Sequence, residues 1–364
     1  MIPAAPTLAW KPDWAEARRA LTDWWAGRGL AISVIAPKEQ PWEEIPAPVK
    51  PADPKDWWMD VTYWVQRAHR NMSRTYYGGV AFPAFNTTIG GAGSLGLFLG
   101  ATGVPAETTL WYEPSIHDPA THPPLRFDPE NAWWKLHIEL LEQALGQSRG
   151  RYIVGFPDLI ENIDTLAQLR ESQVVLMDLV ERPDWVKARL AEINAAFFEC
   201  YDRLWEILRD PWGGSAFFAF QLWGAGRVCK IQCDLSCMIS PAMFREFVVP
   251  GLTEQCERLD YTLYHLDGTQ ALHHLDALLE IEALAAIEWT PQAGLPGGGS
   301  PRWHDLYRRI KAAGKSVQAI GVKPDEIEPL IEAVGADGLY IHTRTPTEPA
   351  ARALLNKFGW KPRS

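Results

Sequence analysis

Short apolar runs alternate with longer amphipathic segments along most of the chain, a pattern typical of repeated βα units. In such units each buried strand is followed by a covering helix, so the strands form a parallel sheet. A TIM (β/α)8 barrel has eight such strands. The pattern therefore predicts an α/β protein with a TIM (β/α)8 barrel, with strands at Leu30–Ile35, Val80–Phe85, Tyr152–Phe156, Ala216–Gln221, Thr262–Asp267, Ala285–Trp289, Ser316–Ile320 and Gly338–His342.

Helix start signals separate these strands. The clearest is Ser240-Pro241, with serine at the cap and proline in the first turn, where its missing N–H costs nothing. We expect helices over residues 128–147, 182–209, 240–259 and 347–358, and two more that start near Ser300 and Lys323.

The first 75 residues follow another pattern. Two amphipathic segments, Lys11–Arg28 and Asp56–Arg74, flank a proline-rich stretch from Pro37 to Pro54. We predict that residues 1–75 form an N-terminal helical cap packed on the barrel. Residues 76–364 would then form the barrel itself, within one globular unit.

Charge and hydropathy exclude several classes of protein. Acidic residues outnumber Lys and Arg by 45 to 35, and the net charge of −10 argues against nucleic acid and acidic membranes as partners. No apolar run approaches the roughly 20 residues of a membrane helix. The segment Met1–Pro6 has no basic region and no long apolar region follows it, so the chain is expected to be cytoplasmic.

Cysteine and tryptophan usage adds two observations. The five cysteines are an odd number and do not indicate a disulfide framework. Cys229, Cys233 and Cys237 repeat every four residues, but their segment contains Gly226 and no helix start, which disfavours a metal cluster on one helix face. Most of the 18 tryptophans are expected in the core. The rest are compatible with stacking on a flat ligand or with a homodimer face.

The strand that ends in Tyr264-His265-Leu266-Asp267-Gly268 carries the main candidate chemistry. Side chains alternate along a strand, so His265 and Asp267 leave the same face about 7 Å apart. A metal ion or a substrate atom fits between them. The alternative is a core histidine satisfied by a neighbouring carboxylate, and the spacing does not decide between the two.

Polar and aromatic residues also collect at the ends of the other predicted strands. Because TIM-barrel active sites form at the carboxyl ends of the strands, we expect them to share one site. Catalytic roles are expected for His265, Asp267, Glu288 and His342, with His265 and Asp267 as ligands of a divalent metal, zinc first. Without a metal the same groups would serve as acid and base. The predicted substrate-binding residues are Asp158, Gln221, Trp223, Asp234, Trp289 and Arg344.

The segment Ile239–Pro250, followed by a strand that ends in His265-Leu266-Asp267-Gly268, resembles the uroporphyrinogen decarboxylase-like superfamily of TIM barrels. Val154–Pro157 and Met177–Asp184 are similar to earlier parts of that fold, and the likeness covers residues 150 to 358. Tyr76–Pro83 resembles one subgroup only. The superfamily includes the decarboxylase and zinc-dependent methyltransferases that work with a corrinoid protein.

The chain departs from both known activities. The methyltransferases hold zinc with His-x-Cys and a later Cys, whereas here position 267 is Asp and the later loop His342–Thr345 has no Cys. The resemblance therefore implies a site of nitrogen and oxygen ligands, in which Glu288 or His342 joins His265 and Asp267. The arginine-rich N-terminal motif of the decarboxylase is not found.

Three functions remain open at this stage. The first is a metal-assisted methyltransferase or demethylase that takes a small-molecule substrate and passes its methyl group to a corrinoid on a separate protein. The second is a lyase or hydrolase on a carbohydrate-like ligand, in which Asp158, Asp234, Asp267 or Glu288 form a carboxylate pair. The third is a non-catalytic ligand-binding barrel.

Overall fold

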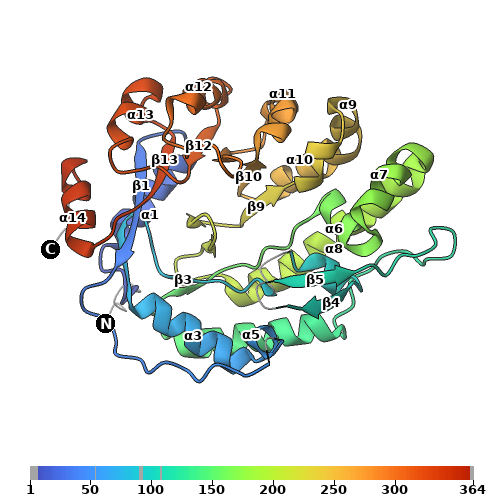
Figure 1. The fold of residues 1–364 in the computed structure, drawn as a ribbon, viewed down its shortest axis with the longest axis horizontal. Helices are drawn as coiled ribbons and strands as arrows, with labels where there is room; N and C mark the ends of the chain where they lie inside the picture. The colour runs from blue at the N-terminus through green and yellow to red at the C-terminus, as the bar shows by residue number, and fades with distance from the viewer. Residues whose placement is uncertain (1–6, 54, 90–92, 107–108, 361–364) are drawn as a thin grey trace.

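The largest sheet of the computed structural model has seven strands (Figure 1). The structure describes residues 7–53, 55–89, 93–106 and 109–360, so the predicted absence of a leader at Met1–Pro6 lies outside the described residues. All neighbours in this sheet are parallel except β2, which runs antiparallel to β1. The strands, in sheet order, are β2 (Thr75–Gly79), β1 (Leu30–Pro37), β13 (Leu339–Arg344), β12 (Ser316–Ala319), β11 (Ala286–Thr290), β10 (Tyr261–Asp267) and β9 (Val228–Gln232).

Three further sheets have two strands each, and together with the large sheet they make a mixed α/β fold. An isolated parallel bridge between Phe156 and Phe217 links two of them. In the part of the chain that the structure describes, hydrogen-bonded pairing does not close these sheets into one barrel. The pairs are β3 (Ala84–Phe85) with β6 (Ile153–Val154), β4 (Thr102–Pro105) with β5 (Leu110–Glu113), and β7 (Ser215–Phe217) with β8 (Leu222–Gly224).

Helices surround the strands, and α3 and α5 pack together along one side of the molecule (Figure 1). No helix in the described ranges is both long and apolar enough to cross a bilayer. The helices are α1 (Trp14–Trp25), α2 (Asp56–Met59), α3 (Val61–Ser73), α4 (Leu95–Phe98), α5 (Ala132–Ser148), α6 (Asn162–Arg170), α7 (Ser172–Glu181), α8 (Pro183–Leu208), α9 (Pro241–Met243), α10 (Val249–Arg258), α11 (Leu275–Leu279), α12 (His304–Ala312), α13 (Ile327–Val334) and α14 (Glu348–Lys357).

Two apolar clusters form the core. The larger one lies between the strands and the outer helices and buries residues such as Ile231, Ile287 and Val317. The smaller one, here called the interior cluster, is built on Trp14 and Trp24 of α1 and takes residues from nine strands. Those residues include Ala31 of β1, Ala84 of β3, Ile153 of β6, Phe217 of β7, Leu222 of β8, Val228 of β9, Leu263 of β10, Ala286 of β11 and Tyr340 of β13.

The first strand, β1, and the later strands match the sequence prediction closely, whereas the strands between them differ. The predicted Val80–Phe85 strand is reduced to Ala84–Phe85, and the predicted Ala216–Gln221 strand ends at Phe217, after which the chain turns. Gln221 closes that turn with φ of 51°, a left-handed conformation that a strand does not contain. The predicted helix at 240–259 is interrupted by a π turn at Phe244–Val248, next to Pro250, which has no N–H to donate.

Residues 1–75 contain the helices α1 and α3 where amphipathic segments were predicted. The same range also contributes β1, which pairs with β13 from Leu30↔Leu339 to Ile35↔Arg344 inside the large sheet. This part of the chain thus supplies both covering helices and a central strand. The proposed boundary at residue 75 stays a prediction.

Candidate functional site

Strands β9, β10 and β11 end at the same edge of the large sheet and bring their last polar residues together. The parallel register places His265 of β10 beside Gln232 of β9 on one side and beside Glu288 of β11 on the other. His265 and Asp267 both project from the edge, because they are two residues apart on β10. Leu266, between them, points into the larger apolar cluster.

Asp234, His265 and Asp267 form the rim cluster. One candidate ligand atom from each residue lies within 4.8 Å of the other two. Asp234 follows β9, so the cluster is assembled from two adjacent strands. The two carboxylates are exposed and the imidazole is mostly buried, which leaves the cluster accessible from one side. Two carboxylate oxygens and one imidazole nitrogen at this separation are a suitable ligand set for a divalent cation.

Glu288 fixes the orientation of the His265 ring. Its Oε2 lies 2.5 Å from Nδ1 of His265, while its Oε1 accepts a 2.8 Å hydrogen bond from the hydroxyl of Thr290. Glu288 is fully buried. Because Nδ1 is engaged by the carboxylate, Nε2 is the ring nitrogen left for a ligand or a proton. Metal-binding histidines commonly have this kind of carboxylate partner on their second nitrogen.

The electrostatics of the pair follow from burial and from the short contact. Burial disfavours the imidazolium of His265, but the charge and hydrogen bond of Glu288 outweigh this and raise its pKa above the usual value. Burial also raises the pKa of Glu288, and His265 opposes that shift. Burial and the charge of Asp234 raise the pKa of Asp267, although His265 lowers it. The site thus retains protons more readily than the isolated side chains would.

Asp234 is positioned by the two residues that contact it. Its Oδ2 accepts a 2.8 Å hydrogen bond from Nε2 of Gln232, and its main-chain N–H donates to Oδ2 of Asp164 at 2.7 Å. The other carboxylate oxygen of Asp164 accepts the N–H of Leu235 at 2.9 Å. Burial, assisted by the charge of Asp234, raises the pKa of Asp164 to about 6.

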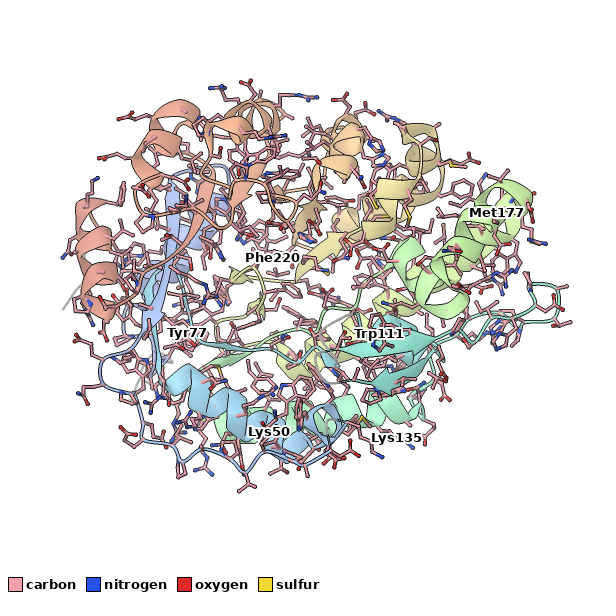
Figure 2. All side chains as sticks on the ribbon, in the orientation of Figure 1. Lys50, Tyr77, Trp111, Lys135, Met177 and Phe220 are labelled. Atoms are coloured by element: carbon pink, nitrogen blue, oxygen red, sulfur yellow. The ribbon has the colours of Figure 1, made fainter. Side chains whose placement is uncertain are left out.

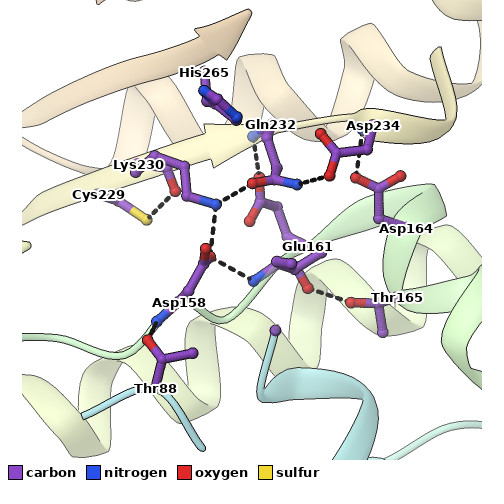
Figure 3. Close-up of polar contacts among 12 residues, drawn as sticks. Thr88, Asp158, Glu161, Asp164, Thr165, Cys229, Lys230, Gln232, Asp234 and His265 are labelled. Atoms are coloured by element: carbon purple, nitrogen blue, oxygen red, sulfur yellow. Dashed lines mark hydrogen bonds and ion pairs between the residues drawn. The ribbon is translucent and has the colours of Figure 1, made fainter. Parts of the chain in front are cut away.

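A buried polar network supports Gln232 from below (Figure 3). Lys230 donates to Oε1 of Gln232 and pairs with Oδ1 of Asp158 at 2.6 Å. The main-chain N–H of Gln232 donates to Glu161 at 2.8 Å. Burial raises the pKa of Glu161 to about 8, against the opposing charge of Lys230. Predicted substrate-binding residue Asp158 therefore belongs to a network that holds β9 and, through Gln232, the carboxylate of Asp234.

His342 and Arg344 lie on a separate cavity of about 650 Å³, which Gln221 also lines. Burial, with the charge of Arg344, lowers the pKa of His342 to about 3, so its imidazole is neutral. Phe220 separates this cavity from the rim cluster: it lines the cavity, and its ring centroid lies 5.0 Å from that of His265. Figure 2 shows Phe220 near the middle of the molecule. His342 is therefore not part of the rim cluster.

Two tryptophans that were expected in the site are structural. Trp289 is fully buried and packs on Trp303, because it follows Glu288 on β11 and so points to the opposite face. Trp223 lies in the interior cluster, and its indole N–H donates to Asp210 at 2.6 Å. Gln221 touches the cavity, but its amide oxygen is engaged by the N–H of Phe82 at 2.9 Å.

Sequence reasoning missed Glu161, Asp164, Lys230 and Gln232. The signal for the last two was the alternation Val228-Cys229-Lys230-Ile231-Gln232, in which apolar and polar residues share a strand. The same strand explains the cysteines, because Cys229 lies on β9, Cys233 just after it, and Cys237 in the following 3-10 turn. The three thiols therefore do not stack on one helix face.

Comparison with solved structures finds a likeness in fold. The chain is similar to a solved structure described as a methyltransferase from Methanosarcina mazei, with a TM-score of 0.59 over 95% of this chain and 99% of that chain. The sequence identity is 10%, so the likeness is one of fold. No family model matches the chain, and no curated protein matches its sequence.

Proposed function

We propose that the protein is a metal-assisted methyltransferase or demethylase that transfers a methyl group from a small molecule to a corrinoid on a separate protein. The observation that carries the proposal is the buried Glu288–His265 pair directly beside the carboxylates of Asp234 and Asp267. The methyltransferase-like fold supports the methyl-transfer part. The corrinoid partner rests on the family resemblance alone.

The sheets fit one interrupted (β/α)8 barrel. The interior cluster takes side chains from nine strands, as the filled inside of a barrel would, and α1 contributes several residues to it. The bridge between Phe156 and Phe217 continues the strand sequence from β6 to β7. In this arrangement the rim cluster lies at the carboxyl ends of the strands, where such barrels place their active sites.

The residues of the rim cluster fit a divalent metal, with zinc as the first candidate. Nε2 of His265 and one carboxylate oxygen each from Asp234 and Asp267 would be the ligands, leaving a coordination position open. A metal held there supplies Lewis-acid polarisation of the heteroatom that carries the methyl group. Glu288 would keep His265 in the ligating orientation and make its Nε2 a better donor to the metal.

The side chains of the rim cluster must also release protons when a metal binds. Metal binding needs a neutral His265, so the proton that the pair retains must leave first. Asp267 is exposed and its pKa is raised in the metal-free site, so it too must give up any proton that it holds before it binds a metal. Phe220 shields one side of the imidazole from solvent.

Metal analysis of the purified protein tests the proposal directly. We expect near-stoichiometric metal in the native protein and its loss in His265→Ala and in Asp267→Asn. His117→Ala is the matched control, because His117 is exposed and outside the rim cluster. Methyl transfer from small donors to free cob(I)alamin should require the bound metal. Native protein that neither contains nor takes up zinc, cobalt or manganese would refute the metal mechanism.

One observation favours a second function, a lyase or hydrolase on a carbohydrate-like ligand. Trp111, with 65% of its surface exposed, lines a cavity of about 750 Å³ together with Asp164 and Asp234. An exposed indole beside two carboxylates suits a sugar, which stacks on the ring while one carboxylate acts as acid. Turnover of sugar substrates in EDTA that is lost in Asp164→Asn would support this function over methyl transfer.

A further inference from the structure

The cavity beside Phe220 has a defined chemical character of its own. It is here called the Arg344 cavity, and its walls come from β1, β2, β13, the turn at 218–221 and the loop at 320–324. Its volume of about 650 Å³ lies in the range of sites for small organic ligands. The walls include Tyr77 and Phe220, both labelled in Figure 2.

Cations without carboxylates line this cavity. Arg344 and Lys323 are on its wall, and no Asp or Glu is among its described lining residues, although the whole chain has a net charge of −10. The cavity that holds Asp164 and Asp234 has the opposite character, with acidic residues and no cation among its described lining residues. The two cavities are therefore of opposite charge on either side of the molecule's centre.

Arg344 is available for a ligand. The nearest carboxylate along the chain, Glu348, is occupied by Lys38 at 3.4 Å and by Arg352 at 2.6 Å. Within the described residues Arg344 itself has no ion pair, whereas most other arginines do. A guanidinium binds a carboxylate or phosphate through two parallel hydrogen bonds. Lys323 has only a 3.7 Å contact with Glu326.

The remaining walls are mostly apolar. Ile35, Phe218, Phe220 and Val322 line the cavity, and the neutral imidazole of His342 adds a polar group without charge. A ligand that fills this space needs an oxyanion at one end and an apolar body. A fully hydrated anion such as inorganic phosphate would leave the apolar walls without a partner.

The cavity also adjoins the rim cluster. Phe220 is a wall of the cavity and at the same time lies 5.0 Å, between ring centroids, from His265. The turn that carries Phe220 is held by its own carbonyl oxygen, which accepts from Nε2 of Gln318 at 2.8 Å. A ligand anchored at Arg344 would therefore contact Phe220, whose ring also packs near His265.

We propose that the Arg344 cavity binds the oxyanion of an organic acid substrate, either a carboxylate or a phosphate ester with a compact apolar body. Arg344 binds the oxyanion, Lys323 adds charge, and Phe220 contacts the apolar body on the side of the cavity next to His265. This inference rests on the proposed function for the reaction that follows binding, but the binding step itself needs no metal.

Ligand binding to metal-free protein in EDTA tests the proposal. The probes are 4-fluorobenzoate and 4-fluorophenyl phosphate, with 4-fluorobenzamide as the uncharged control, and binding is followed by ¹⁹F NMR. We expect binding of at least one anion and weaker binding of the amide. Arg344→Gln should raise the Kd of that anion about 10- to 100-fold, the effect of losing hydrogen bonds to a charged group. The anion with the lower Kd shows whether the cavity prefers a carboxylate or a phosphate ester.

Two further variants separate a local effect from a general one. Arg344→Lys keeps the charge and should recover part of the affinity. Arg126→Gln removes the same charge from an exposed arginine outside the cavity and should leave the Kd unchanged. Equal Kd values in Arg344→Gln and native protein, or equal binding of amide and anions, would overturn the proposal. Because no metal is present, failure here leaves the metal analysis intact, and a metal-free native protein leaves this result intact.

Discussion

Replacing Glu288 by Gln should weaken metal binding without removing a metal ligand. The substitution keeps the shape of the side chain but removes the charge that raises the pKa of His265. The amide can still contact Nδ1 of His265 and the hydroxyl of Thr290, so the ring remains in place. What is lost is the charge-assisted part of a 2.5 Å contact between two buried groups.

The size of the effect follows from that contact. A hydrogen bond to a charged group contributes about 1.5–3 kcal/mol, and loss of such a carboxylate partner lowers metal affinity by about 10- to 100-fold. The pKa of His265 should fall, because burial lowers it and the charge of Glu288 no longer raises it. Below the pKa of an unfolded histidine the native pair contributes its full stability, and this contribution disappears as pH rises through the higher folded-state value. The affinity for zinc should therefore increase over the same increase in pH, because His265 must lose its proton to bind the metal.

The assay combines two measurements on one set of proteins. A competition titration with a chromogenic chelator gives the zinc Kd, and ¹⁵N-histidine NMR of the metal-free protein gives the pKa of His265. Glu332→Gln is the control, since Glu332 is exposed and lies away from the rim cluster. Native values for both the Kd and the pKa in Glu288→Gln would refute the role assigned to this pair.

Three other outcomes are expected. Lys11→Met should lower the free energy of unfolding in urea by about 3–5 kcal/mol. Lys11 is buried, pairs with Asp13 at 2.9 Å and donates to two main-chain carbonyls of β2. A loss below about 1 kcal/mol would contradict this. Gly79→Ala should prevent accumulation of folded protein at 37 °C, because φ at this position is 64° and the new Cβ would lie 2.0 Å from the carbonyl oxygen of Ile32. A native circular dichroism spectrum of the purified variant would contradict this prediction. His342→Asn should make the protein more resistant to acid unfolding between about pH 6.5 and 3. In that range His342 stays neutral in the folded protein, whereas the same histidine in the unfolded chain takes up a proton. An unchanged midpoint of acid unfolding would argue against a buried neutral imidazole.

The parts of the fold that could be predicted best are strands of the large sheet. β1, β10, β11, β12 and β13 were found within two residues of their bounds, and each contains at least three consecutive buried residues. β9 was not found, because Lys230 and Gln232 occupy two of its five positions. Lys230 is buried with its charge paired to Asp158, and the main-chain N–H of Gln232 donates to Glu161, so both contacts come from a segment about 70 residues earlier. A single strand's sequence contains no sign of such a partner.

The candidate site shows the same division. His265, Asp267 and Asp234 were named from strand ends, and the structure brings them together. The pairing of His265 with Glu288 follows from adjacent parallel strands. Trp289 could have been excluded by alternation, since it neighbours Glu288 on one strand. The separation of His342 from the cluster could not have been foreseen, because it depends on the turn that inserts Phe220.

The pairing of β1 with β13 has a consequence for synthesis of the chain. β1 can pair with β13 only after Leu339, the partner of Leu30 and about 300 residues later in the chain, has been synthesised. At translation rates of roughly 5–20 residues per second the wait is about 15–60 s, during which β1 has one unpaired edge on the ribosome. Antiparallel β2, made within 50 residues of β1, can cover the other edge early. Until β13 is made, the edge of β1 that faces β13 in the folded protein can pair with a wrong strand.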